Sequence, residues 1–173
     1  MFSKGDYVIY GTNGICLIQD ITTLTISGVD KKREYYFLKP VYLSTSTIYI
    51  PVDTADGVLR KAVSKEEADE LIKSIPDIPL IELVDEKTIE YTYKEYMHVG
   101  NCTSYIQLIK TIYVRKEKRL LNGNKITAVD SRYFKQAEDC LYGELAVALD
   151  MSRDEVRTYI SECIEQHAAA EES

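Results

Sequence analysis

Side chains that could form a catalytic or metal site are few and widely separated in this sequence. The four cysteines (Cys16, Cys102, Cys140 and Cys163) never form a CxxC pair, and only His98 and His167 accompany them. Zinc sites need closely spaced ligands, so we expect no metal and interpret the cysteines as reduced thiols acting as small apolar residues. No carboxylate pair, Cys–His pair or nucleotide-binding glycine loop has convincing spacing. The sequence therefore predicts a protein that is not an enzyme and takes no cofactor or small-molecule substrate.

The chemistry that the sequence does offer is a basic segment between two acidic ones. Residues 109–135 carry eight basic and two acidic side chains, whereas 64–108 carry four and ten, and 136–173 carry two and ten. A polyanion would have to meet the chain at this basic segment. At helical spacing, Lys110, Arg115, Lys118 and Arg119 share one arc of a predicted helix. That arc is either a solvated helix face or a set of phosphate contacts.

Aromatic side chains precede the basic segment. Tyr91, Tyr93 and Tyr96 lie in a predicted helix over 86–99. A flat aromatic ring with a polar edge can prop open a base step from the minor groove. Tyrosine is equally common in the core of a helical domain, so both interpretations of these residues stay open.

The first part of the chain, residues 1–63, is predicted to be a small β-barrel of the SH3 or Tudor kind. Strands are expected over 7–10, 15–26, 34–38 and 47–50, with 58–59 as a short fifth, and a glycine turn at 11–14 joins the first two. We expect exposed edge strands at 22–26 and 47–50, which could pair with a partner's sheet. Their side chains Leu24, Ile26, Tyr49 and Ile50 are the candidate contacts. The alternative is that both strands are paired inside the barrel.

The second part, residues 64–173, is predicted to be a compact all-α domain. Ser64 and Glu67 form a capping box before a helix that stops at Pro76. Helices over 86–99 and 102–121 follow, and Thr127 caps a fourth that runs to about residue 148. Ser152 and Glu155 form a second capping box before the last helix. The fold class is thus α+β with two domains.

Neither a membrane span nor a secretory leader is recognisable in this sequence. No apolar run approaches the roughly 20 residues that cross a bilayer, and the N-terminus lacks a basic stretch followed by an apolar one. We expect a cytoplasmic, monomeric protein without membrane partners.

Several motifs resemble those of the CarD/CdnL family of bacterial transcription regulators. The opening FSKGDYVIYGTNGICLIQDI, then EYYFLKPVY and TIYIPVD, and finally RYFKQAEDCLYGELAVAL follow that family's order over nearly the whole chain. The opening hairpin is also similar to the polymerase-binding module of transcription-repair coupling factors. The resemblance implies a Tudor-like domain that binds the β-subunit lobe of RNA polymerase, and a helical domain that touches promoter DNA at the upstream edge of the melted bubble.

The chain departs from the family at the residues that would carry these contacts. The family's tryptophan wedge falls at Tyr91, and this chain has no tryptophan. The basic pair that follows the wedge is reduced to Tyr93-Lys94. Arginines that the family uses against polymerase fall near Leu24 and Tyr49. We expect a weaker wedge and a more apolar polymerase contact.

The resulting hypothesis is a regulator that binds the polymerase β subunit, contacts upstream promoter DNA and modulates open-complex stability, with DNA binding weak in the absence of polymerase. Its expected DNA-binding residues are Tyr91, Tyr93, Lys94, Lys110, Arg115, Lys118, Arg119 and Arg132. Its expected polymerase-binding residues are Leu24, Ile26, Tyr49 and Ile50. The alternative is an adaptor whose barrel binds polymerase or a repair factor and whose helical domain binds another protein instead of DNA.

Overall fold

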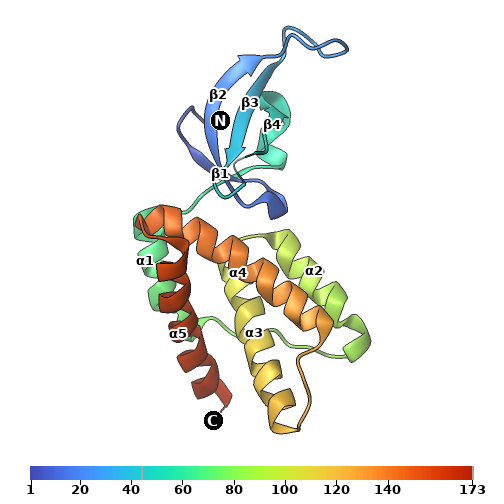
Figure 1. Ribbon diagram of the computed structural model, residues 1–173, viewed down its shortest axis with the longest axis vertical. Helices are drawn as coiled ribbons and strands as arrows, with labels where there is room; N and C mark the ends of the chain where they lie inside the picture. Colours follow the sequence, from blue (N-terminus) through green and yellow to red (C-terminus); the bar gives the residue numbers. More distant parts are fainter. Residues whose placement is uncertain (44, 173) are drawn as a thin grey trace. The chain divides into compact units, whose positions relative to one another are not determined.

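The computed structural model describes residues 1–43 and 45–172, apart from the side chains of residue 163 and of residues 167–172. The chain divides into two compact units, Met1–Ala62 and Val63–Ser173. The first unit is a β-sheet and the second is a group of helices (Figure 1). The fold is therefore the α+β two-domain class that the sequence predicts, with the division one residue before the predicted boundary at residue 63.

The described residues of the sheet unit form five antiparallel strands in the spatial order β4-β3-β2-β1-β5. The strands are β1 (Tyr7–Ile9), β2 (Ile15–Thr23), β3 (Glu34–Pro40), β4 (Ile48–Pro51) and β5 (Arg60–Lys61), with short 3-10 turns η1 (Gly11–Asn13) and η2 (Val52–Gly57). Among the described residues β4 and β5 are the two edges, so the strand pairing is that of an open sheet and does not show a closed barrel.

One face of the sheet carries the core of this unit. Successive side chains of a strand point to opposite faces, and on β3 the inward residues Tyr36 and Leu38 are buried. They pack with Val8, Cys16 and Ile18 of the neighbouring strands. Phe2 closes one side of this core: its backbone N–H donates to the Tyr36 hydroxyl at 3.0 Å, and its ring meets the Tyr36 ring edge-on.

Two strand predictions needed correction. β2 ends at Thr23 instead of residue 26, because the chain turns at Gly28, whose φ of +87° suits glycine. Leu24 and Ile26 therefore lie in the connection between β2 and β3. The predicted strand at 58–59 is displaced to β5, because Val58 and Leu59 both donate backbone hydrogen bonds to Ala55 at the end of η2.

In the helical unit, the described residues form five α-helices whose starts agree closely with the capping residues. The elements are α1 (Lys65–Ser74), η3 (Ile75–Asp77), η4 (Glu86–Thr88), α2 (Ile89–Val99), α3 (Cys102–Leu121), α4 (Ala128–Leu149) and α5 (Arg153–Glu172). The Ser64 hydroxyl accepts from Glu67 N at 3.1 Å, and the Thr127 hydroxyl accepts from Asp130 N at 3.0 Å. At α5 the Ser152–Glu155 bonds are reciprocal, as in a capping box.

α3 is the central helix of this unit. It packs against α2, α4 and α5, and in Figure 1 it runs between α2 and α5 with α4 crossing it. Its side chains are consequently buried on nearly all sides from Cys102 to Val114, including polar ones. A continuous solvated arc, which the helical spacing predicts, does not exist on most of this helix.

A buried carboxylate holds the beginning of the helical unit. Glu144 of α4 is buried, and its carboxylate accepts from the Val63 backbone N–H at 3.0 Å and from the Cys102 thiol at 3.4 Å. The α4 helix itself ends at Asp150, which is the one described residue other than glycine with a positive φ, 52°. Its backbone N–H closes the last turn on the carbonyls of Ala146 and Val147.

Candidate functional site

A buried polar network fixes the orientation of α2. The Tyr93 hydroxyl donates to Asp130 Oδ1 at 2.7 Å, and Arg115 Nε donates to Asp130 Oδ2 at 3.2 Å. Arg115 also reaches Glu86 at 3.4 Å, so the network joins η4, α2, α3 and α4. Burial, reinforced by the bond to Asp130, raises the pKa of Tyr93 above its ordinary value, so the phenol stays a hydrogen-bond donor.

This network corrects two predicted DNA contacts. Tyr93 has no exposed surface and packs its ring on Tyr133 at 5.5 Å between centroids, so it belongs to the core. The Arg115 side chain is 20% exposed and is engaged with two carboxylates. Both residues are committed to holding the helices together, because a buried Asp130 needs hydrogen bonds and a counter-charge.

Lys110 is a third correction. Its side chain is completely buried, and its ammonium group donates to the backbone carbonyls of Ile75 at 3.0 Å and Ile78 at 2.6 Å. These carbonyls belong to the segment that follows α1, at the 3-10 turn η3 and its C-terminal end. Lys110 therefore fastens the α1–α2 connection onto α3 and is out of reach of DNA.

Tyr91, in contrast, lies at the surface. It is 68% exposed in the first turn of α2, so the alternative in which it packs in the core is wrong for this residue. Three side chains converge on one carboxylate oxygen of the neighbouring Glu90: Arg132 from α4 in a short contact, the Tyr133 hydroxyl at 3.4 Å, and Lys94 at 4.0 Å. Tyr91 thus stands beside cations that a buried framework positions.

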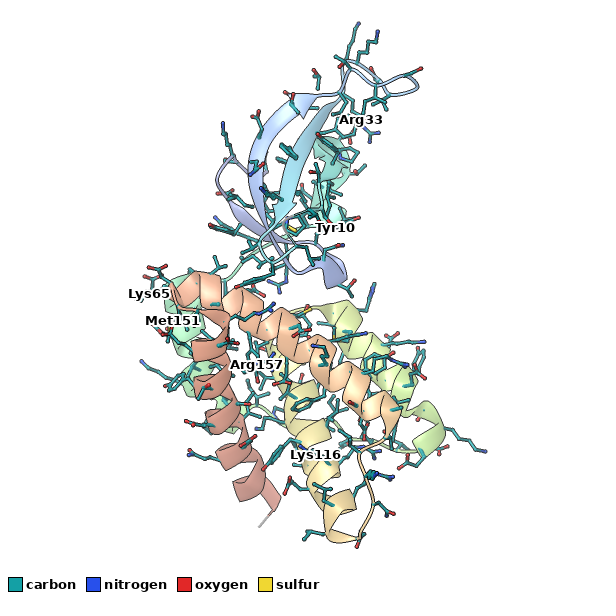
Figure 2. The ribbon with its side chains drawn as sticks, viewed as in Figure 1. Tyr10, Arg33, Lys65, Lys116, Met151 and Arg157 are labelled. Carbon is teal, nitrogen blue, oxygen red and sulfur yellow. The ribbon has the colours of Figure 1, made fainter. Side chains whose placement is uncertain are left out.

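The remaining predicted cations lie at the end of α3. Lys118 is exposed, whereas Arg119 is half-buried and donates from Nε to the Lys125 carbonyl at 2.8 Å, which folds the α3–α4 turn. Lys116, labelled in Figure 2, lies on the same part of the helix and is half-buried. We call Tyr91, Lys94 and Arg132 the Tyr91 surface. With Lys118 at the end of α3, four of the eight predicted DNA-binding residues are in exposed positions.

The sheet unit presents an aromatic surface on the face opposite its core. Phe37 on β3 lies directly across from Tyr49 on the edge strand β4, and the two rings stack at 5.3 Å with 14° between their planes. A shallow pocket of about 390 Å³ adjoins Phe37 and is also lined by Leu17, Lys4 and Asp20. Tyr49 is 41% exposed, so the predicted contact residue is accessible. We call Tyr49, Phe37 and Leu17 the aromatic sheet face.

The other predicted polymerase contacts, Ile50, Ile26 and Leu24, differ in their exposure to solvent. Ile50 alternates with Tyr49 along β4, points into the core and is 7% exposed, so its side chain is a correction to the predicted set. Ile26 is exposed and Leu24 is half-buried, both just beyond β2. Thr22 and Thr23 pair only with β3, because the pairing of β1 with β2 stops at Leu17. That end of β2 is therefore unpaired on one side, as are the outer sides of the edge strands β4 and β5 in the described sheet.

Phe37 and Leu17 were missing from the predicted site. Both alternate with inward residues along their strands, so a strict two-residue period around Tyr36, Leu38 and Ile18 would have pointed to them. Another surface contact sits at the far end of β3, where Arg33 binds both carboxylate oxygens of Asp53 in η2 (Figure 2). Hydrogen bonding to Arg33 lowers the pKa of Asp53.

Neither a metal site nor a membrane-spanning helix is found among the described residues. Within the described part of the chain, no group of three or more histidine, cysteine, aspartate or glutamate side chains is arranged to hold a metal ion, and the side chains of Cys163 and His167 lie outside that part. None of the described helices combines the length and apolar character that crossing a membrane requires.

The comparison with known families identifies the sheet unit. Residues 2–63 match the family model described as the CarD-like/TRCF RID domain. The match includes all five strands and therefore the aromatic sheet face, and it ends where the helical unit begins.

Proposed function

We propose, from the premise that the sheet unit is a CarD-like/TRCF RID domain and the chain a CarD-like family member, that this protein is a transcription regulator. In this proposal the sheet unit binds the β subunit of RNA polymerase, and the helical unit contacts upstream promoter DNA and modulates open-complex stability. The family assignment itself marks a transcription-associated, protein-interacting role. The finer partners and the role of the helical unit are the proposal.

The aromatic sheet face supports the polymerase contact. The Tyr49 ring on the edge strand β4 stacks on Phe37 of the inner strand β3, so a large apolar area lies beside backbone groups of β4 that can extend a partner's sheet. Backbone pairing depends little on side-chain identity, which is why loss of the family's arginines is compatible with binding.

A pull-down with the isolated β lobe tests this contact. We expect Tyr49→Asp to reduce recovery of the lobe strongly and Leu24→Asp to reduce it less, because Tyr49 is in the stacked pair and Leu24 is beyond the strand. Val58→Asp is the matched control, since Val58 is 50% exposed outside the strands. Unchanged recovery of both variants would remove this surface as the interface.

The observation that carries the DNA contact is the exposure of Tyr91 beside positioned cations. The Tyr91 ring is exposed at the start of α2. The hydrogen bonds of Tyr93 and Arg115 to the buried Asp130 fix the position of that helix. A regulator shifts the equilibrium between closed and open complexes only if it binds the open state better. A preference of about 1–2 kcal/mol would change the open-complex occupancy roughly 5- to 30-fold.

Open-complex lifetime is the direct measurement. We expect Tyr91→Ala to shorten the lifetime that the wild-type protein confers, with recruitment to polymerase unchanged. Tyr159→Ala is the matched control, because Tyr159 is a similarly exposed tyrosine on α5. Equal lifetimes for wild type and Tyr91→Ala would remove the wedge from the proposal.

The adaptor is the second candidate, and one observation favours it. Lys94 and Arg132 both face Glu90, so phosphates would have to compete with a carboxylate for these cations. The net charge of −7 acts in the same direction. A footprint of the polymerase–promoter complex separates the two candidates, because only the DNA-contacting regulator adds protection upstream of the bubble.

A further inference from the structure

An apolar groove lies on the helical unit, away from the Tyr91 surface. It has a volume of about 470 Å³ and is lined by Ile72 and Lys73 of α1, Leu149 of α4, Met151, and Tyr159 of α5, with Asp69 at its rim. α1 and α5 both pack against α4, so they form two walls and the end of α4 forms the floor. Figure 2 labels Met151, which lies where α4 turns into α5, beside α1.

The lining side chains are accessible in spite of their apolar character. Met151 is 42% exposed and Tyr159 is 51% exposed, and both are among the large apolar residues that the fold leaves at its surface. Apolar side chains gathered in a concave site, in place of scattered single residues, are typical of an interaction surface. None of them takes part in the proposed contacts with polymerase or DNA.

The helices around the groove are acidic. Over 65–73 and 150–162 the chain carries eight acidic and four basic side chains. One of the four, Arg157, is turned to Asp139 at 3.7 Å and lies over the Tyr142 ring, so its charge is already compensated on another side of α5. The lining itself carries one acid, Asp69, and one base, Lys73. The net charge of −4 on the segments that flank the groove is therefore what favours a cationic ligand.

We propose that this groove binds a basic amphipathic helix of a partner protein. The walls are helices and offer no strand edge, so an extended peptide would leave its backbone donors and acceptors without partners, whereas a helix satisfies its own. Apolar side chains at i, i+3, i+4 and i+7 would enter between α1 and α5, and lysine or arginine side chains would face the acidic rim. This inference does not rest on the proposed polymerase or DNA contacts.

A synthetic peptide tests the proposal on the full-length chain. The probe is a leucine–lysine peptide of about 18 residues with helical leucine spacing, and the control peptide has the same composition in an order without that period. We expect the ordered peptide to bind at least about tenfold more tightly than the permuted one, because only the former presents one apolar face. Equal binding of the two peptides would show general charge attraction and would overturn the proposal.

Variants of the lining residues localise the binding. We expect Tyr159→Ala combined with Met151→Ala to weaken the ordered peptide about tenfold, and Asp69→Lys to weaken it several-fold with a shallower salt dependence. Leu121→Ala is the matched control and should leave the affinity unchanged, since Leu121 is 86% exposed at the end of α3 and lines neither the groove nor a proposed contact. Insensitivity to both groove variants would overturn the site.

Analytical ultracentrifugation of the chain alone tests whether a second copy of this chain occupies the groove instead of a partner helix. Concentration-dependent dimers that the Tyr159→Ala, Met151→Ala variant abolishes would assign the groove to a second copy of this chain and overturn the partner-helix proposal. A chain that stays monomeric while binding the ordered peptide supports it.

Discussion

Tyr91 and Tyr93 are close neighbours on α2 with opposite surroundings. Tyr91 is 68% exposed, whereas Tyr93 is fully buried and donates to Asp130. The hydroxyl group of Tyr93 therefore contributes a buried hydrogen bond to the stability of the fold, whereas the Tyr91 side chain lies at the surface.

This contrast predicts different effects of the same substitution. We expect Tyr93→Phe to lower the free energy of unfolding by about 1–3 kcal/mol, because Asp130 loses a buried donor. Tyr91→Phe should change it by less than about 0.5 kcal/mol, as for other surface substitutions. Urea unfolding of both variants measures the difference, and similar losses would contradict the network.

Cys16 gives a prediction about pH. Burial in the sheet core raises the pKa of its thiol from 9.0 to about 11. Because the folded state holds this proton more tightly than the unfolded state, the stabilising contribution is complete below pH 9 and is lost as the pH rises toward 11. We expect the sheet unit to lose roughly 1 kcal/mol between pH 8 and pH 10 from this group.

NMR signals of the sheet unit during urea titrations at the two pH values would measure that loss. Cys16→Ala is the comparison, since it removes this titration while costing stability through the missing packing. The stability gap between wild type and variant should narrow at pH 10. A gap that is independent of pH would show that the thiol does not titrate in this range.

At the scale of elements, the packing of α3 decides which cations remain available. Lys110 and Arg115 share the arc of Lys118 and Arg119 by periodicity, but the segment after α1 covers Lys110, and Arg115 lies against η4 and α4. Their charges are met by backbone carbonyls and by carboxylates, respectively. The helix becomes available to an anionic partner only in its last turns.

Arg115 therefore has a structural role that mutation can expose. We expect Arg115→Met to lower the free energy of unfolding by about 3 kcal/mol, because it leaves the buried Asp130 without its counter-charge. Lys118→Met on the same helix is the control and should change stability by less than about 0.5 kcal/mol. Adding Asp130→Asn to Arg115→Met should recover part of the loss, and additive losses would argue against the pair.

Capping chemistry made the helices predictable, and three-dimensional neighbours limited the prediction of the site. Ser64, Thr127 and Ser152 act on donors within three residues, so their positions define helix starts locally. The burial of Tyr93 and Lys110 depends on partners 37 and 35 residues away in sequence, Asp130 and the Ile75 carbonyl. One-helix periodicity holds no information about such partners.

The strands show the same limit in another form. The alternation of inward and outward residues along β3 can be read from the sequence of β3 alone. The pairing of Phe37 with Tyr49 and the inward position of Ile50 depend on the register between β3 and β4. β2 ends early because its pairing with β3 stops at Thr23 and Glu34, and the β-forming residue types at 24–26 do not reveal where that pairing stops. The register between neighbouring strands therefore decides which side chains lie together on one face of the sheet.

At the scale of the molecule, three of the cations that were predicted to bind DNA are exposed. Lys94, Arg132 and Lys118 are exposed, so three phosphate contacts would give a slope of roughly −2.7 in a plot of log affinity against log salt. Affinity of this kind is weak, and tethering through polymerase would supply the missing effective concentration.

Salt titration of the polymerase–promoter complex tests this count. We expect Lys118→Gln to reduce the salt slope contributed by this protein by about 0.9 and Lys65→Gln to leave it unchanged, since Lys65 is on α1. Tight promoter binding by the protein without polymerase would contradict the tethered mechanism.

Asp150, the left-handed residue that ends α4, is expected to affect the stability of the chain and its affinity for the peptide in opposite directions. Asp150 adopts a conformation that favours glycine or asparagine, and its negative charge lies at the negative end of the helix dipole. Asp150→Asn should therefore stabilise the chain by about 0.5 kcal/mol in thermal unfolding. Asp150 stands between Leu149 and Met151, so the same change should weaken the cationic helical peptide. A variant that melts later yet binds the peptide less tightly would mark this position as one where thermostability has been traded for partner affinity.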